Sequence, residues 1–368
     1  MSTTLRVFIS CLPRFEVLLH DELQARLAGR KLSRKRGGVE LRITHDELWM
    51  LSHDLRIAES IRVRIGSFSA PNFDALNEGL KRIPWSAYLD RDALPPIDVA
   101  CAKSALYHDD AVAERVRGFF VERGGVAEDA ELPTVQVRIV NDAAVVSVDA
   151  SGDGLHRRGL RPGVLRAPLR ETYAAACLRI SGLDRSSHLV DPVCGTGVFL
   201  AERAGIEGGF LLPRRFAFER WASHAPEAYA QWCAMRGGPV FPQGLQLVGG
   251  DKSATALRTA SDNLEVWKGG ASLTLRNVDA EELLSGVPDD ADVIANPPWG
   301  QRMHGASAVG GIFGRWLRGR SADAPGQVVV LVAGHEMIRA TGVRWHELIS
   351  FRDGGTTVRL LSYDPRKA

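Results

Sequence analysis

Residues 190–199 read Val-Asp-Pro-Val-Cys-Gly-Thr-Gly-Val-Phe, and this stretch decides the fold of the C-terminal half. The run 188–191 predicts a strand that ends in the carboxylate Asp191, and a turn containing Gly195 and Gly197 leads into a helix. A dinucleotide fingerprint needs a third glycine where Leu200 stands, so the turn does not favour an NAD site. The carboxylate instead suits a ligand that carries a cation.

Outward from this stretch, short apolar runs alternate with helical segments. Strands are expected at 245–248, 273–276, 293–295 and 328–332, helices at 168–180, 198–204 and 255–267, and a last pair of strands at 348–351 and 357–363. This alternation predicts a doubly wound sheet rich in parallel strands. Ligands of such sheets bind at the carboxyl ends of the strands.

Two aspartates follow expected strands of this sheet. Asp251 comes after 245–248, where a carboxylate can accept both hydroxyls of a ribose, although a helix N-cap is an equal reading of its position. Asp279, with Ala280 beside it, follows 273–276 and could face the amino group of an adenine. By itself the position of Asp279 after a strand does not establish this role.

The sharpest motif is Asn296-Pro297-Pro298-Trp299-Gly300, directly after the expected strand 293–295. Two prolines fix φ and remove N–H donors, which leaves carbonyl oxygens on a rigid turn beside the Asn amide. Such a turn offers acceptors for an exocyclic NH2 group, and the Trp ring offers a stacking platform. A proline turn without function is the alternative, but polar motifs at successive strand ends argue against it.

The N-terminal half mixes strands and helices without regular alternation, which predicts α+β layers. Strands are expected at 5–10, 39–43, 62–68, 97–100, 135–140 and 145–149, with helices at 13–27 and 109–123. Residues 151–163 contain four glycines and a proline and predict a linker. A chain of 368 residues exceeds the usual size of one hydrophobic core, so several domains are expected.

Composition narrows the class of protein. The net charge is only +2, yet basic residues cluster at 26–42 and at 151–185, a pattern compatible with nucleic acid or with a solvated surface. The five cysteines form no C-x-x-C pair and the ten histidines form no metal motif, so neither disulfides nor a metal are expected. No apolar run is long enough to cross a membrane, and 7–12 is too short for a signal core. We expect a cytoplasmic protein.

Several segments resemble one family. Residues 191–197 with 296–300 are similar to class I S-adenosylmethionine-dependent methyltransferases that act on amino groups. Residues 151–161, 167–172 and 215–221 narrow this to the THUMP-domain RNA guanine-N2 methyltransferases, which include the bacterial 23S rRNA enzyme and tRNA guanosine enzymes. The resemblance covers nearly the whole chain and is weaker before residue 100.

The resemblance implies a ferredoxin-like segment at 1–55, a THUMP domain at 56–150, a linker at 151–166 and a Rossmann-like methyltransferase domain at 167–368. The first two would hold structured RNA (rRNA or tRNA), and the enzyme would act as a monomer. S-adenosyl-L-methionine would be the cofactor. The implied cofactor-binding residues are Asp191, Cys194, Gly195, Thr196, Gly197, Asp251, Asp279, Ala280 and Asn296; the implied catalytic residues are Asn296, Pro297 and Trp299.

Within the resemblance, Asp191 and the glycines would line the methionine end, Asp251 the ribose and Asp279 the adenine. Three features depart from the pattern. Cys194 follows Val193 where many relatives have bulkier residues, and an aromatic-rich insertion at about 205–243, similar to one in relatives, separates Asp191 from Asp251. The second methyltransferase of the fused bacterial rRNA enzyme is expected to be absent. Two other functions stay open, a DNA adenine-N6 methyltransferase and an RNA-binding assembly factor without catalysis.

Overall fold

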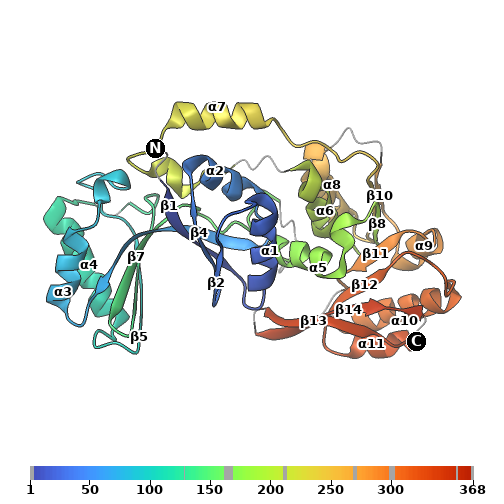
Figure 1. The fold of residues 1–368 in the computed structure, drawn as a ribbon. Coiled ribbons are helices and arrows are strands. Elements are labelled where there is room, and N and C mark those ends of the chain that lie inside the picture. Colours follow the sequence, from blue (N-terminus) through green and yellow to red (C-terminus); the bar gives the residue numbers. More distant parts are fainter. Residues whose placement is uncertain are drawn as a thin grey trace. The chain divides into compact units, whose positions relative to one another are not determined.

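The computed structural model describes residues 4–127, 129–160, 169–209, 214–267, 272–297, 303–353 and 355–365. The chain forms two compact units (Figure 1). Unit 1 consists of Met1–Arg157 together with Pro213–Gly237, and unit 2 consists of Arg158–Leu212 together with Gly238–Ala368. Each unit is built on one seven-stranded sheet.

The sheet of unit 1 has the strand order β2-β3-β1-β4-β7-β6-β5. Its strands are β1 (Leu5–Cys11), β2 (Ser33–Lys35), β3 (Gly38–Ile43), β4 (Ala58–Ser69), β5 (Ile97–Ala102), β6 (Val135–Val140) and β7 (Ala143–Asp149). All pairs are antiparallel except β5 with β6. Val7, Val63 and Val148 are neighbours in register and fully or almost fully buried, so one face of the sheet carries the core.

Four longer helices complete the N-terminal part of unit 1. They are α1 (Glu16–Arg26), α2 (His45–Asp54), α3 (Phe73–Lys81) and α4 (Asp109–Arg123). The helix expected at 109–123 is observed with those bounds, and it ends where Gly124 takes a φ of 117°. α1 begins three residues later than expected because Arg14 adopts a φ of 77°, which a helix does not accept.

The sheet of unit 2 has the order β10-β9-β8-β11-β12-β14-β13. Its strands are β8 (His188–Asp191), β9 (Gln246–Gly250), β10 (Leu273–Arg276), β11 (Asp292–Ala295), β12 (Val328–Ala333), β13 (His346–Asp353) and β14 (Thr356–Tyr363). The first five in this order run parallel, and β14 and β13 add an antiparallel edge. The predicted parallel-rich α/β sheet is confirmed.

Helices lie before, between and after the parallel strands of unit 2. They are α5 (Glu171–Ser181), α6 (Val198–Gly208), α8 (Ala254–Leu264), α9 (Ala280–Ser285), α10 (Met303–Gly319) and α11 (Glu336–Thr341). Part of the core consists of Val190, Val293, Val330 and Phe313, all buried. Because β8, β9, β10 and β11 are parallel, the segments that follow them all leave at one edge of the sheet.

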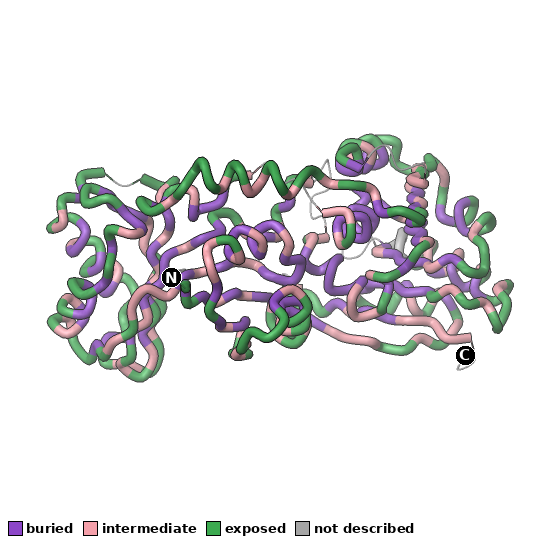
Figure 2. Tube along the Cα trace, turned by 45° about the horizontal axis from the view of Figure 1, so that its top comes forward, coloured by how far each residue is buried: buried purple, intermediate pink, exposed green. Residues whose placement is uncertain are grey.

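The segment 213–237 leaves unit 2 and packs in unit 1. Phe216 lies 4.9 Å from His53 of α2, and helix α7 (Pro226–Arg236) brings Tyr229 to that histidine, with 2.9 Å between Nε2 and the hydroxyl oxygen. Trp221 donates its ring N–H to the Asp149 carbonyl at 3.0 Å. α7 has no buried residue, so Figure 2 shows it mainly green and pink. The expected domain 167–368 counts this segment as its own insertion, whereas its aromatic side chains pack with unit 1.

The start of the expected linker 151–166 is folded. The Ile61 N–H donates to Ser151 Oγ at 2.6 Å, and the Leu155 N–H donates to the Glu59 carbonyl at 2.9 Å. Arg214 reinforces this stretch by donating to the Ser151 carbonyl at 2.8 Å. Residues 151–155 therefore extend unit 1 along β4, and 161–166 lie outside the described residues.

Candidate methyl-donor and target site

The turn between β8 and α6 has the geometry that its glycines predict. Gly195 and Gly197 adopt φ values of 53° and 79°, which other residues rarely take. The Cys194 N–H donates to the Gly250 carbonyl at 2.9 Å, and the Gly197 N–H donates back to the Cys194 carbonyl at 2.8 Å. The turn is thereby joined to the end of the neighbouring strand β9.

Asp191 ends β8 as a buried acid with 2% exposure. Its Oδ1 accepts from the Val193 N–H at 3.2 Å. Burial, with a smaller contribution from the charge of Asp251, raises the pKa of Asp191 to about 8. A cation that binds beside these acids would favour the ionised form of Asp191, so the pair is suited to a positively charged group.

Asp251 follows β9 and holds the turn from the other side. Its Oδ2 accepts from the Gly195 N–H at 3.0 Å, and its Oδ1 accepts from the Ser253 N–H at 2.8 Å. The N-cap of α8 is Ser253, whose hydroxyl accepts from the Ala256 N–H at 3.2 Å. The helix-cap reading of Asp251 is therefore wrong. A carboxylate has about four acceptor positions, so both oxygens keep capacity for a ligand.

Asp279 and Ala280 stand at the beginning of α9, after β10. Asp279 is exposed, and its Oδ1 caps the helix by accepting from the Glu282 N–H at 2.9 Å. Ala280 is buried. α9 lies close to the end of β9, because a Cβ added to Gly250 would be 2.8 Å from Leu283 Cδ2. One carboxylate oxygen of Asp279 thus caps α9, and the cap does not use the other oxygen.

Asn296 and Pro297 follow β11, the neighbour of β8. Val293 pairs with Val190, so the residues after each strand leave the sheet side by side. Asn296 is half-buried and Pro297 is buried. Trp299, the expected stacking ring, lies outside the described residues. The parallel register thus places Asn296 and Pro297 next to the turn that follows Asp191.

Two asparagines that sequence reasoning missed support the turn. Asn263 of α8 is buried and donates from Nδ2 to the Thr196 carbonyl at 2.9 Å. Asn277, just after β10, donates from Nδ2 to the Asp251 carbonyl at 2.9 Å. The position of Asn277 after a strand is a signal that could have found it. Asn263 lies inside a helix and gives no local signal.

The described ranges hold neither a candidate metal site nor a membrane-spanning helix. There, no three His, Cys, Asp or Glu side chains are grouped to hold a metal ion. No helix in those ranges is long and apolar enough to span a bilayer.

A glycine turn, paired carboxylates and an Asn-Pro motif at the carboxyl edge of this sheet define a class I methyltransferase fold. The family model described as RMKL-like, methyltransferase domain (UPF0020) matches residues 158–341, and the THUMP domain model matches 70–149. The chain belongs to the UPF0020, RMKL-like methyltransferase family, with a THUMP domain before the methyltransferase domain.

Similar proteins are known. The chain is 28% identical to the ribosomal RNA large subunit methyltransferase K/L of Syntrophotalea carbinolica, over 99% of this chain and 54% of that protein. The chain spans about half the length of such curated relatives. A Listeria monocytogenes structure described as a predicted N6-adenine-specific DNA methylase is 25% identical, with a TM-score of 0.79 over 97% of this chain and 96% of that one. The structure of SMU.472 complexed with SAH shares the fold at 21% identity, with a TM-score of 0.80 over 99% and 98% of the two chains.

Proposed function

We propose that this protein is an S-adenosylmethionine-dependent RNA methyltransferase that methylates the exocyclic N2 of a guanosine in structured RNA, either rRNA or tRNA. The observation that carries the proposal is the register of β11 beside β8, which sets the acceptors after Ala295 next to the turn after Asp191. The THUMP domain and the rRNA methyltransferases among the relatives support RNA as the substrate. Such a substrate points to the cytoplasm.

The residues of the turn fit S-adenosylmethionine. Asp191 supplies a buried carboxylate for the cationic methionine end, and Asp251 has acceptor positions left for ribose hydroxyls. The turn is closely packed, because a Cβ added to Gly197 would lie 3.2 Å from Ala260 Cβ. Asp279 and Ala280 are the proposed neighbours of the adenine. When bound, the cofactor supplies a methyl group made electrophilic by its sulfonium.

The protein would act mainly by positioning the target amino group. The Asn296 side-chain oxygen and the Pro297 carbonyl can accept the two N2 hydrogens, which aims the nitrogen lone pair at the methyl carbon. During methylation positive charge would develop on N2, and the Asn296 side-chain oxygen and the Pro297 carbonyl would stabilise it. The proton then passes to solvent. Trp299 is proposed to stack on the base, which has to be unpaired or flipped out.

A DNA adenine-N6 methyltransferase is the second candidate. Acceptors on a rigid turn suit any planar amino group, and the Listeria relative bears a DNA methylase description. The THUMP domain favours RNA over this reading.

Methyl transfer from labelled S-adenosylmethionine tests these candidates directly. The full chain would be offered an unmodified 23S rRNA transcript, unmodified tRNA and duplex DNA, and the products would be digested to nucleosides for mass spectrometry. We expect N2-methylguanosine in one RNA, formed more slowly with Asn296→Ala. N6-methyladenine in DNA would establish the second candidate instead. RNA binding without calorimetric binding of S-adenosylmethionine would favour an assembly factor.

A further inference from the structure

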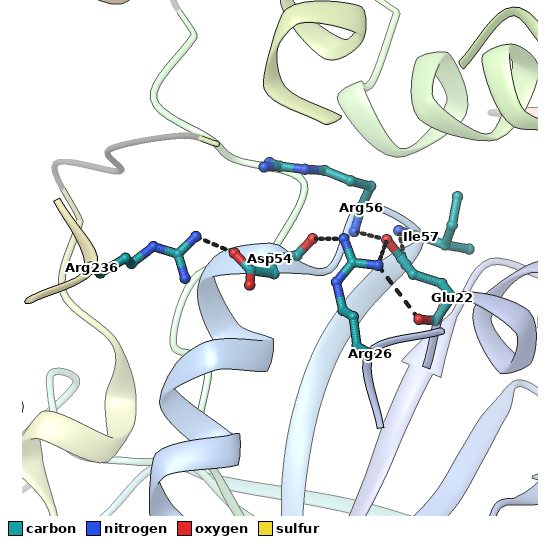
Figure 3. A network of polar contacts seen from close by, with 6 residues as sticks. All are labelled: Glu22, Arg26, Asp54, Arg56, Ile57 and Arg236. Atoms are coloured by element: carbon teal, nitrogen blue, oxygen red, sulfur yellow. Dashed lines mark hydrogen bonds and ion pairs between the residues drawn. The ribbon is translucent and has the colours of Figure 1, made fainter. Parts of the chain in front are cut away.

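The basic cluster at 26–42 divides into side chains that the fold uses and side chains that it does not. Arg26 is used: its Nη2 donates to the Asp54 carbonyl at 3.0 Å and its Nη1 lies 3.4 Å from Glu22 Oε1 (Figure 3). Arg30 is also used, since its Nη2 lies 2.6 Å from Glu47 Oε1. Their charges are compensated within unit 1.

Arg42 is exposed on β3, opposite Arg6. The remaining four basic residues surround the short β2–β3 hairpin. Lys31, Arg34, Lys35 and Arg36 are all exposed. In the part of the chain that the structure describes, none of the four makes an ion pair. We call residues 31–36 the basic hairpin.

The acids near the basic hairpin already have partners. Glu40 of β3 lies 2.7 Å from Arg6 Nη2 through Oε1 and 2.6 Å from Arg64 Nε through Oε2. Glu16 Oε1 accepts from the Gly37 N–H at 3.0 Å. Arg34 and Lys35 also interact electrostatically with Glu16 and Glu40, respectively. The four basic residues of the hairpin, together with Arg6 and Arg64, nevertheless outnumber these two acids, so the hairpin keeps a net positive charge.

The register spreads this charge around the hairpin. Arg34 pairs with Val39, which is fully buried, so Arg34 lies on the core side of the sheet. Lys35 pairs with Gly38 and lies on the opposite side, while Arg36 sits in the turn. Because β2 is an edge strand, all three reach solvent. Charge on two faces and a tip suits phosphates arranged on more than one side, as in a folded RNA.

The second basic cluster is different. Arg158 and Glu202 form an ion pair at 2.6 Å in which both side chains are almost completely buried. Arg157 lies 3.3 Å from Asp153. These two of the seven arginines at 151–185 serve the fold or are paired within the protein.

We propose that the basic hairpin binds the phosphodiester backbone of the structured RNA substrate and supplies much of the salt-dependent affinity. This inference rests on the proposed function for the identity of the RNA. Phosphate contacts release counterions, so each lost contact lowers the salt dependence of binding by an amount of about 0.7 to 0.9 in log–log slope.

The test is the triple variant Arg34→Gln/Lys35→Gln/Arg36→Gln in the full chain. Its affinity for the unmodified 23S rRNA transcript and for tRNA would be measured at several salt concentrations. We expect binding to whichever RNA the wild type binds to weaken roughly 10-fold or more, with a slope smaller by about two to three. Calorimetric binding of SAH should not change.

A control with the same change of charge is Arg258→Gln/Arg339→Gln/Arg344→Gln, at exposed positions of unit 2. This control should keep the wild-type slope; an equal loss in both triples would reduce the effect to net charge and overturn the proposal. Unchanged RNA binding with new self-association of the hairpin variant would also overturn it and would leave edge protection as the role of these charges. If the wild type methylates no RNA yet the hairpin variant alone loses affinity, the proposed reaction fails and the binding surface stands.

Discussion

Replacing Asp191 by Asn isolates the charge at the end of β8. Asn can keep the side-chain oxygen that accepts from the Val193 N–H at 3.2 Å, and it has nearly the same size. The substitution removes the carboxyl group. Burial and the charge of the neighbouring Asp251 raise the pKa of that group to about 8. The substitution should therefore act in opposite directions on stability and on cofactor binding.

The effect on stability depends on pH. An unfolded aspartate has a pKa of about 3.9, so between about pH 4 and 8 the folded protein holds a proton that the unfolded chain has released. The stability linked to that proton is fully present below pH 4 and is lost as the pH rises through 8. Relative to Asp191→Asn, the wild type should lose about 1.4 kcal/mol of unfolding free energy per pH unit, or about 3 kcal/mol over two units inside this window.

Binding of S-adenosylmethionine should become weaker in the same variant. Asn cannot supply a negative charge to the cationic end of S-adenosylmethionine, and a hydrogen bond to a charged group contributes about 1.5 to 3 kcal/mol. The calorimetric Kd should therefore rise roughly 10-fold or more. Urea denaturation at several pH values gives the stability difference, and Asp323→Asn, an exposed aspartate of the same unit, is the matched control.

Two results would refute this reasoning. If the stability curves of the wild type and Asp191→Asn run parallel across pH 5 to 8, the acid is not protonated in the folded protein. If the Kd for S-adenosylmethionine is unchanged, Asp191 does not pair with the cation.

Asp251→Ala removes the acceptor of the Gly195 N–H and the proposed ribose contact, so the Kd for SAH should rise roughly 10-fold or more; an unaltered isotherm would contradict the assignment. Asn296→Ala should slow single-turnover methyl transfer at saturating RNA without changing cofactor affinity, and a rate restored by more RNA would limit Asn296 to binding. In the same assay Trp299→Phe should outperform Trp299→Ala, because stacking contributes about 1 to 3 kcal/mol per base, and the reverse order would argue against stacking. A fragment of residues 158–368 should aggregate on size-exclusion chromatography, and one that also has a short Gly-Ser joint in place of 213–237 should not; equal elution would contradict the packing of that segment in unit 1.

Much of the site follows from local signals in the sequence. Strands β6, β8 and β10 have the predicted bounds because short apolar runs end at turn residues. The approach of Asp251 to Gly195 follows from the sheet rule, since the carboxyl ends of adjacent parallel strands meet at one edge. Applying this rule requires only the order of strands and helices along the chain.

Features that depend on distant partners could not be predicted in this way. The hydrogen bond between Tyr229 and His53 joins residues that are 176 positions apart. The sequence around α7 therefore wrongly assigns this helix to the methyltransferase domain. Arg158 counts as surface charge until its partner Glu202, 44 positions away, is known. Asp279 is both a proposed ligand contact and an observed helix cap, and its position after a strand is consistent with either role.

The return of residues 213–237 to unit 1 has a consequence for synthesis on the ribosome. Unit 1 lacks its last segment until residue 237 has emerged, 80 residues after Arg157. Tyr229 follows His53 by 176 positions, so at about 5 to 20 residues per second Trp49 and His53 wait roughly 9 to 35 seconds for the rings of Tyr229 and Trp232. During that interval the first segment of unit 2, including β8 and α6, is also made but has no neighbouring strands. Unit 2 receives its remaining strands, β9 to β14, only after residue 237, so unit 1 is completed first. Until residue 237 has emerged, the nascent chain exposes an aromatic surface that a chaperone could bind.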